Sequence, residues 1–160
     1  LKNISKMESV KTKILDYLKG NDCFFNEIFH KPAASAEEYH NELGTKYEQQ
    51  AKALFVRYKK PGLKSYAVIA IQAQKKCDLE RIKRLLNASE IRMADVGQLK
   101  AETGCDFGQL PPFGKLFGFQ LLMDQELINE DCIYFNCGDL SFSLSMDPKI
   151  IQKIEDPIIF

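Results

Sequence analysis

Two apolar runs separated by three residues constrain the fold of this chain more than any other feature. Residues 50–60 (QAKALFVRYKK) and 64–74 (KSYAVIAIQAQ) are rich in aromatic, β-branched and other apolar residues. Their connection is Pro-Gly-Leu, and both Pro and Gly favour tight turns. The pattern predicts two strands paired as a β-hairpin, so the domain must be built around a sheet that contains this hairpin.

The other elements follow from apolar spacing and from capping residues. Helices are expected over 9–20, ending at a Gly20 cap, and over 35–44, 78–87, 95–104 and 147–154. Ser35, Asp78, Asp95 and Asp147 are the expected N-caps, with Ser35 and Glu38 forming a capping box. Strands are expected over 23–30, 89–94, 116–124, 131–138 and 140–146. This order predicts an α+β fold with a mixed, largely antiparallel sheet flanked by helices.

The chain has 160 residues, which is the size of one domain, and we expect a single domain over residues 1–160. Either the chain starts at Met7 and residues 1–6 are an appendage to it, or residues 1–7 are expected to lack regular structure. No apolar run approaches the roughly 20 residues of a membrane helix. We therefore expect a cytoplasmic protein with no membrane partner.

The five cysteines show no metal-binding spacing. They are Cys23, Cys77, Cys105, Cys132 and Cys137, with no Cys-x-x-Cys pair and no histidine close to them in sequence. We expect reduced, mostly buried thiols, no metal and no cofactor. A nucleophilic role for Cys105 or Cys137 is not expected, because neither has a neighbouring base in the sequence.

The net charge is zero, but the charge is unevenly spread. Residues 57–84 contain nine basic and two acidic residues, a net charge of +7, whereas residues 124–160 carry −6. One interpretation is a face that binds a polyanion. The other is a solvated hairpin followed by a solvated helix.

Residues 106–115, DFGQLPPFGK, contain two glycines and two adjacent prolines. We call this segment the Gly-Pro loop. Four residues that fix or release backbone angles are more than a single turn requires. The loop is either a rigid turn before a strand or a segment whose backbone groups act on a ligand.

Three segments identify a family. QAKALFVRY, ETGCDFGQLPPFGK and DCIYFNCG, with the Gly-x-x-x-Pro pattern at 108–112 and a lysine at Lys52, resemble the YbaK/aminoacyl-tRNA synthetase-associated domain. The resemblance runs from about residue 35 to residue 154. It implies a YbaK-like fold and hydrolysis in trans of the ester of a mischarged aminoacyl-tRNA. Seryl- or threonyl-tRNA, or mischarged prolyl-tRNA acceptors, are the implied substrates.

The resemblance also implies roles for individual residues. Lys52 would bind a phosphate or the ribose of the terminal nucleotide, while the Gly-Pro loop would stabilise an oxyanion through backbone N–H groups. The implied catalytic residues are Lys52, Gly108 and Pro112. The implied substrate-binding residues are Ser35, Gln109, Leu110, Pro111, Phe113, Gly114, Asn136 and Gly138.

The implied partner is the acceptor end of a tRNA, with an aminoacyl-tRNA synthetase as a second candidate and no DNA. Arg57, Lys59, Lys60 and Arg84 are the expected tRNA contacts. Simpler interpretations remain open: Lys52 could be a lysine that reaches solvent, and Ser35 could be only an N-cap. Family members that edit alanyl-tRNA carry a pocket histidine near a glycine, at the place where this chain has Asn136, Gly138 and Asp139. This chain has no histidine after His40, and the difference argues against alanyl-tRNA. Two rival functions are a non-catalytic tRNA- or synthetase-binding domain and a small-molecule-binding protein.

Overall fold

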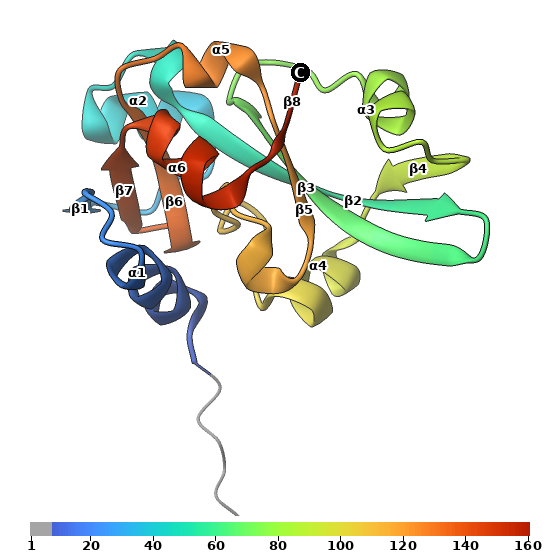
Figure 1. Cartoon of the computed structure of the whole chain (residues 1–160). Helices are drawn as coiled ribbons and strands as arrows, with labels where there is room; N and C mark the ends of the chain where they lie inside the picture. Colours follow the sequence, from blue (N-terminus) through green and yellow to red (C-terminus); the bar gives the residue numbers. More distant parts are fainter. Residues whose placement is uncertain (1–7) are drawn as a thin grey trace, which may run out of the picture.

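The computed structural model describes residues 8–160, in which two sheets share the main core (Figure 1). A three-stranded antiparallel sheet has the order β1-β7-β6, and a five-stranded sheet has the order β4-β2-β3-β5-β8. In the larger sheet, β3–β5 and β5–β8 are parallel pairs, whereas β2 pairs antiparallel with both neighbours. The predicted α+β class with mixed, largely antiparallel pairing is confirmed. The expectations for residues 1–7 lie outside the described residues.

The hairpin predicted from the sequence forms the centre of the larger sheet. Strand β2 (Ala51–Lys60) pairs with β3 (Leu63–Gln72) over their full length, from Ala51 opposite Gln72 to Lys60 opposite Leu63. Gly62 closes the turn with φ 74°, a conformation that favours glycine. The hairpin crosses the whole molecule, so its two ends lie in different surroundings (Figure 1).

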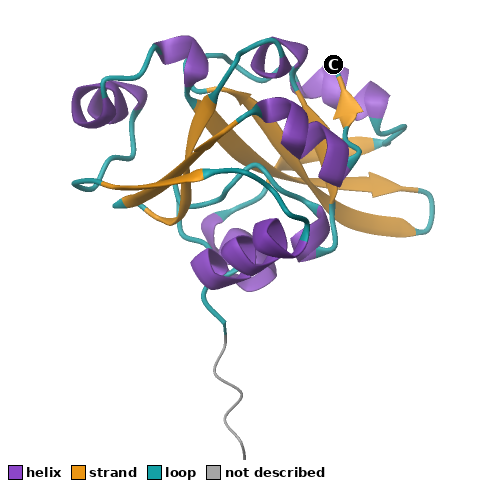
Figure 2. Cartoon of the chain, turned by 60° about the vertical axis from the view of Figure 1, so that its left-hand side comes forward, coloured by secondary structure: helices purple, strands orange, loops and turns teal. Residues whose placement is uncertain are grey.

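The remaining elements surround this hairpin on both sides (Figure 2). The other strands are β1 (Asn26–Phe29), β4 (Glu90–Met93), β5 (Gln120–Met123), β6 (Ile133–Asp139), β7 (Phe142–Met146) and β8 (Ile158–Ile159). The helices are α1 (Val10–Gly20), α2 (Ala36–Leu43), α3 (Leu79–Leu85), α4 (Val96–Thr103), α5 (Gln125–Ile128) and α6 (Pro148–Glu155). Side chains of Ser35, Asp78, Asp95 and Asp147 cap α2, α3, α4 and α6, as predicted.

Two hydrophobic clusters cover the two faces of the larger sheet. The main cluster joins one face to the smaller sheet, to α1 and to the Gly-Pro loop, with Phe113, Phe135 and Phe142 almost fully buried. The second cluster packs the opposite face against α3 through Ile82 and Leu86. Because side chains alternate along a strand, successive residues of β2 point into different clusters.

The structure differs from the sequence-based boundaries in a few places. The strand expected over 116–124 is β5 alone, because Lys115–Phe117 form a 3₁₀ turn that ends at Gly118 with φ 81°. The strand expected over 23–30 shortens to β1. Gly20 is the last helical residue of α1 rather than its cap. The C-cap is Asn21, whose side-chain Nδ2 donates a hydrogen bond to the Tyr17 carbonyl. The predicted capping box is incomplete. Glu38 N–H donates to Ser35 Oγ, but the Glu38 carboxylate accepts from the Ser35 hydroxyl and not from the Ser35 backbone N–H.

Candidate active site

A cavity of about 230 Å³ lies where β2 has no neighbouring strand on one side. Strand β4 pairs with β2 only from Val56 to Lys59, so residues 51–54 form a free edge on that side. The Phe55 carbonyl accepts from Ala94 N–H across this edge. Since alternate residues of a strand turn their backbone groups to the same side, Ala53 presents its N–H and C=O to the cavity.

The cavity wall is mostly apolar and wraps around this free edge, because residues from both faces of β2 line it. Six alanines keep it open, and the polar groups on it are few. The lining residues are Ala34, Ser35, Ala36, Tyr39, Gln50, Ala51, Lys52, Ala53, Leu54, Phe55, Ala73, Met93, Ala94, Leu99, Phe107, Gly108, Leu110 and Asn136. An apolar pocket with a few polar groups is the usual form of a small-ligand site.

Among residues 8–160, Lys52 brings the only ammonium or carboxylate group to this wall. It lies opposite Ile71 and shares its face of β2 with Leu54 and Val56, because side chains alternate along a strand. Lys52 forms no ion pair or hydrogen bond with another residue of the described chain, 8–160. Burial lowers its pKa, and the nearby Cys77 thiol acts weakly in the opposite sense. A half-buried cation without an internal partner is suited to an anionic or strongly polar ligand.

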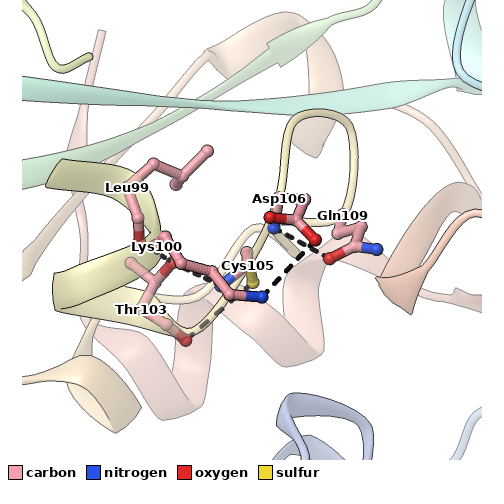
Figure 3. Close-up of polar contacts among 6 residues, drawn as sticks. All are labelled: Leu99, Lys100, Thr103, Cys105, Asp106 and Gln109. Atoms are coloured by element: carbon pink, nitrogen blue, oxygen red, sulfur yellow. Dashed lines mark hydrogen bonds and ion pairs between the residues drawn. The ribbon is translucent and has the colours of Figure 1, made fainter. Parts of the chain in front are cut away.

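The first half of the Gly-Pro loop is fixed by hydrogen bonds that follow α4 (Figure 3). Thr103 Oγ1 donates to the Leu99 carbonyl at 2.7 Å and accepts from Cys105 N–H at 3.1 Å. Asp106 N–H donates to Gln109 Oε1 at 2.8 Å, and Gln109 N–H donates to the Asp106 carbonyl at 3.1 Å. The Gln109 side chain therefore closes the loop on itself and is absent from the cavity wall.

Gly108 occupies the tip of this closed turn and lines the cavity. Its φ of 82° lies in the region that favours glycine, and an added Cβ would come within 3.1 Å of Leu140 Cδ2. Within residues 8–160, the N–H groups of Gly108 and Leu110 have no hydrogen-bond partner. Pro111 and Pro112 have no N–H at all. Both residues line the cavity, and their two N–H groups are the candidate backbone donors to a ligand there.

Asn136 connects two walls of the cavity. Its Nδ2 donates to the Ala33 carbonyl at 2.9 Å and to the Gly108 carbonyl at 3.1 Å. Its Oδ1 accepts from Ser143 Oγ at 3.0 Å, and Ser143 Oγ lies 2.7 Å from His30 Nε2. These linked hydrogen bonds fix the orientation of the Asn136 amide and, through it, the position of Gly108.

Several residues to which the resemblance gave a role lie outside the cavity wall, including Pro112, one of the three implied catalytic residues. Pro111, Pro112 and Phe113 are buried, and Phe113 packs edge-on against Tyr17 and Phe135. A Cβ on Gly114 would lie 2.5 Å from the Phe119 carbonyl, so glycine is required there by packing. Gly138 N–H donates to the Gln109 carbonyl, and a Cβ on Gly138 would lie 2.9 Å from Lys11 N. These residues shape the loop, whereas Ser35, Lys52, Gly108, Leu110 and Asn136 reach the cavity.

The basic residues assigned to tRNA divide between two faces of the sheet. Arg57 and Lys59 share the β2 face of Ala53 and Phe55, on the far side of the strand from Lys52. Lys60 has the opposite parity, and Arg84 is exposed on α3, which covers the opposite face. Lys59 also forms an ion pair of 3.3 Å with Glu90. The basic residues of the segment 57–84 therefore do not form one continuous surface beside the cavity: Arg57 and Lys59 lie on one face of the sheet, and Lys60 and Arg84 lie on the other.

Sequence reasoning did not single out Tyr39, Gln50 or Phe107. The Phe107 side chain is 76% exposed beside the cavity, and Tyr39 and Gln50 are nearly buried in its wall. An aromatic residue directly before the Gly-x-x-x-Pro pattern was a usable signal for Phe107. Tyr39 lies among polar residues of α2, and only the tertiary structure places it in the cavity wall.

Cys105 and Cys137 are fully buried. Burial raises the pKa of the Cys105 thiol, and burial raises that of Cys137 to about 12. Both thiols therefore stay protonated at neutral pH, which disfavours a nucleophilic role. Over residues 8–160, no three His, Cys, Asp or Glu side chains gather as a metal-binding group, and no helix there could span a membrane.

Comparison with known proteins places the chain in a family. Residues 30–154 match the family model of the aminoacyl-tRNA editing domain. The chain is 25% identical over 146 residues to the Multifunctional Ser/Thr-tRNA deacylase ProXp-y of Escherichia coli K12, covering 91% of this chain and 87% of that protein. The same protein of Escherichia coli O157:H7 matches equally.

Solved structures show the same fold at lower identity. The hypothetical protein APE2540 superposes with a TM-score of 0.83 at 19% identity, over 92% of this chain and 96% of that one. A candidate trans-editing enzyme for prolyl-tRNA synthetase superposes with a TM-score of 0.81 at 17% identity, over 97% of each chain. With the family model matching most of its length, the chain belongs to the aminoacyl-tRNA editing domain family.

Proposed function

We propose that this protein hydrolyses the ester of mischarged aminoacyl-tRNA in trans, with a seryl, threonyl or similar small aminoacyl group as the substrate. The observation that carries the proposal is the pairing, on one cavity wall, of an unpartnered Lys52 with the free N–H groups of Gly108 and Leu110. Family membership and the name of the E. coli relative support the same reaction.

The proposed reaction needs no protein nucleophile, because an aminoacyl ester is already activated. Water adds to the carbonyl carbon and gives up a proton, and the resulting oxyanion binds the two loop N–H groups. The bond to the 3′ oxygen then breaks, and that oxygen takes up a proton as it leaves. Each well-placed donor in such a site is worth roughly 3 kcal/mol.

In this proposal Lys52 binds a phosphate or the ribose of the terminal nucleotide at the free β2 edge. Ser35 and Asn136 complete the wall, while Pro111, Pro112, Gln109, Phe113, Gly114 and Gly138 hold the loop in shape. The tRNA acceptor end extends along the face that carries Arg57 and Lys59. Cytoplasmic location and contact with an aminoacyl-tRNA synthetase are part of the proposal; co-purification of a synthetase with the tagged protein tests the latter.

A panel of tRNAs, each charged with a correct or a wrong amino acid, tests the proposal. We expect release of the amino acid from seryl or threonyl esters on non-cognate tRNA at least a hundredfold above the uncatalysed rate, with no effect of EDTA. Binding of tRNA without faster release would support the rival non-catalytic function and contradict the proposed one. Restoration of EDTA-inhibited activity by zinc would contradict the metal-free mechanism.

A further inference from the structure

Two polar atoms buried at the cavity have no partner. Tyr39 and Gln50 both line the cavity, with exposed fractions of only 6% and 2%. Within the described chain, the Tyr39 hydroxyl and Gln50 Oε1 are the buried side-chain polar atoms that lack a hydrogen bond. Leaving such atoms unsatisfied costs roughly 1–3 kcal/mol each. Because both residues belong to the wall of one cavity, a ligand held there is the candidate partner for both atoms.

The orientation of the Gln50 amide is fixed by its own donors. Gln50 Nε2 donates to the Ala36 carbonyl at 3.1 Å and to Thr45 Oγ1 at 3.2 Å. Both N–H bonds of the amide are therefore used. Gln50 Oε1 is left as a pure acceptor, which only a donor from a ligand or water can satisfy.

Tyr39 offers the complementary group. Burial raises the pKa of its phenol, so the hydroxyl keeps its proton at neutral pH. The Ser143 hydroxyl lies close enough to Tyr39 to oppose this rise in pKa, but the two oxygens do not meet hydrogen-bond geometry. Ser143 Oγ instead donates to Asn136 Oδ1 and lies 2.7 Å from His30 Nε2. The Tyr39 O–H is thus free to donate to a ligand oxygen.

We propose that Tyr39 and Gln50 bind a hydroxyl group on the side chain of the substrate's amino acid, and so select seryl and threonyl esters over alanyl esters. A hydroxyl donates to Gln50 Oε1 and accepts from Tyr39, and it replaces a bound water bond for bond. The substrate's α-ammonium fits less well, because no carboxylate lines the cavity and Lys52 would repel it. The ribose is attached to the bulky tRNA, and therefore belongs at the cavity mouth rather than at these buried atoms.

The inference rests on the proposed reaction and is tested by one comparison of substrates. Seryl and alanyl esters of the same tRNA differ only in the hydroxyl. We expect Tyr39→Phe to lower kcat/KM for the seryl ester about tenfold and to leave the alanyl ester within about twofold. Tyr58→Phe, a buried tyrosine of β2 outside the cavity, is the matched control and should change neither value. An equal loss on both esters would mean a structural or ribose-binding role for Tyr39 and would overturn the proposal, as would no loss.

A binding measurement separates failure of the reaction from failure of the inference. The probes are the stable 3′-seryl and 3′-alanyl amides of 3′-amino-3′-deoxyadenosine, titrated by calorimetry. We expect the wild type to bind the seryl amide several-fold more tightly and Tyr39→Phe to bind the two alike. This selectivity without ester hydrolysis would contradict the proposed function alone. Hydrolysis without this selectivity would overturn only the role of Tyr39 and Gln50.

Discussion

Gly108 combines two demands at one position. Its φ of 82° favours glycine, and the residue lies on the cavity wall with a free N–H. Gly118 has nearly the same φ, 81°, but an added Cβ there meets nothing within 4 Å and the residue is outside this cavity. Comparing alanine substitutions at Gly108 and Gly118 therefore distinguishes two effects. Both substitutions strain the backbone, but only the one at Gly108 also disturbs the cavity wall.

We expect Gly108→Ala to lower kcat about a hundredfold, because the Cβ pushes on Leu140 and turns the neighbouring N–H groups away from the oxyanion. Gly118→Ala should lose similar stability, about 1 kcal/mol, without this loss of rate. Deacylation rates and melting temperatures of both variants check the prediction. Full activity of a folded Gly108→Ala protein would mean that the loop is only a turn.

The buried cysteines give the opposite expectation. Cys105→Ala and Cys137→Ala each remove one sulfur from the core, so we expect losses of about 1 kcal/mol in stability. Activity should stay within about twofold, since both thiols are protonated and buried. Mass spectrometry during turnover checks the same point, because a cysteine nucleophile would form an acyl-enzyme.

The lowered pKa of Lys52 predicts a pH dependence. Lys52 loses its proton below the ordinary lysine value of 10.5, so enzyme-catalysed hydrolysis should fall as pH rises through the folded-state pKa. Lys52→Arg should keep its charge and shift this alkaline fall to higher pH, and Lys52→Ala should be nearly inactive at all pH values. Rates corrected for spontaneous hydrolysis provide the measurement; an identical alkaline limb in Lys52→Arg would contradict the assignment.

The lowered pKa of Lys52 also predicts how the stability of the fold changes with pH. Because the folded state binds this proton more weakly than the unfolded chain, the free energy of unfolding should rise with pH between the folded-state pKa and 10.5. The rise should vanish in Lys52→Met, which denaturant unfolding at several pH values can check.

Among the elements, α6 holds the second half of the Gly-Pro loop. Glu155, at the end of α6, is 3% exposed, and its Oε1 accepts from Gly114 N–H at 2.6 Å and Lys115 N–H at 3.2 Å. Its Oε2 accepts from the Tyr17 hydroxyl of α1 at 2.6 Å. One carboxylate thus joins two helices and the loop.

We expect Glu155→Ala to lower the free energy of unfolding by about 3 kcal/mol, since it leaves two N–H groups and one hydroxyl without an acceptor. Tyr17→Phe removes a single bond to the carboxylate and should cost roughly half as much. Denaturant titrations measure both. Equal, small losses would show that the carboxylate is not the central acceptor.

Across the whole molecule, the hairpin connects the cavity with the basic surface. Lys52 and Lys59 are seven residues apart on β2, about 23 Å at 3.3 Å per residue. That length matches a substrate whose reacting end enters the cavity while its phosphates lie along Arg57 and Lys59. Lys52 itself lies on the face covered by α3, so this route crosses the free edge of β2 between the cavity and Arg57. Arg84 lies on the α3 side of the sheet, away from Arg57 and Lys59.

We therefore expect Arg57→Glu combined with Lys59→Glu to raise KM for aminoacyl-tRNA about tenfold with little change in kcat, and to flatten the salt dependence of binding. Arg84→Glu, on α3, changes the charge equally per residue and should have a much smaller effect. A larger effect of Arg84→Glu would place the tRNA on the other face.

Local features of the fold followed from the sequence because they depend on neighbours in the chain. The hairpin and its Pro-Gly turn, and the capping side chains of Ser35, Asp78, Asp95 and Asp147, are confirmed. The position of Lys52 on the same strand face as Leu54 and Val56 follows from strand alternation. Its role in the site was assigned only through the family resemblance and stays a prediction. The boundary error at 116–124 arose because the 3₁₀ turn there is stabilised by a distant carboxylate, Glu155.

Only the tertiary structure decided which residues line the candidate site. Gly108 and Gly114 look equivalent in the sequence, but one faces the cavity and the other packs against the Phe119–Leu121 backbone. The free edge of β2 exists because β4 stops pairing at Val56. Asn136, Ala33 and Gly108 meet through hydrogen bonds between residues 28 and 103 positions apart. The sequence specifies each element through short-range hydrogen bonds and apolar periodicity, whereas the cavity is formed by groups that folding brings together from distant segments.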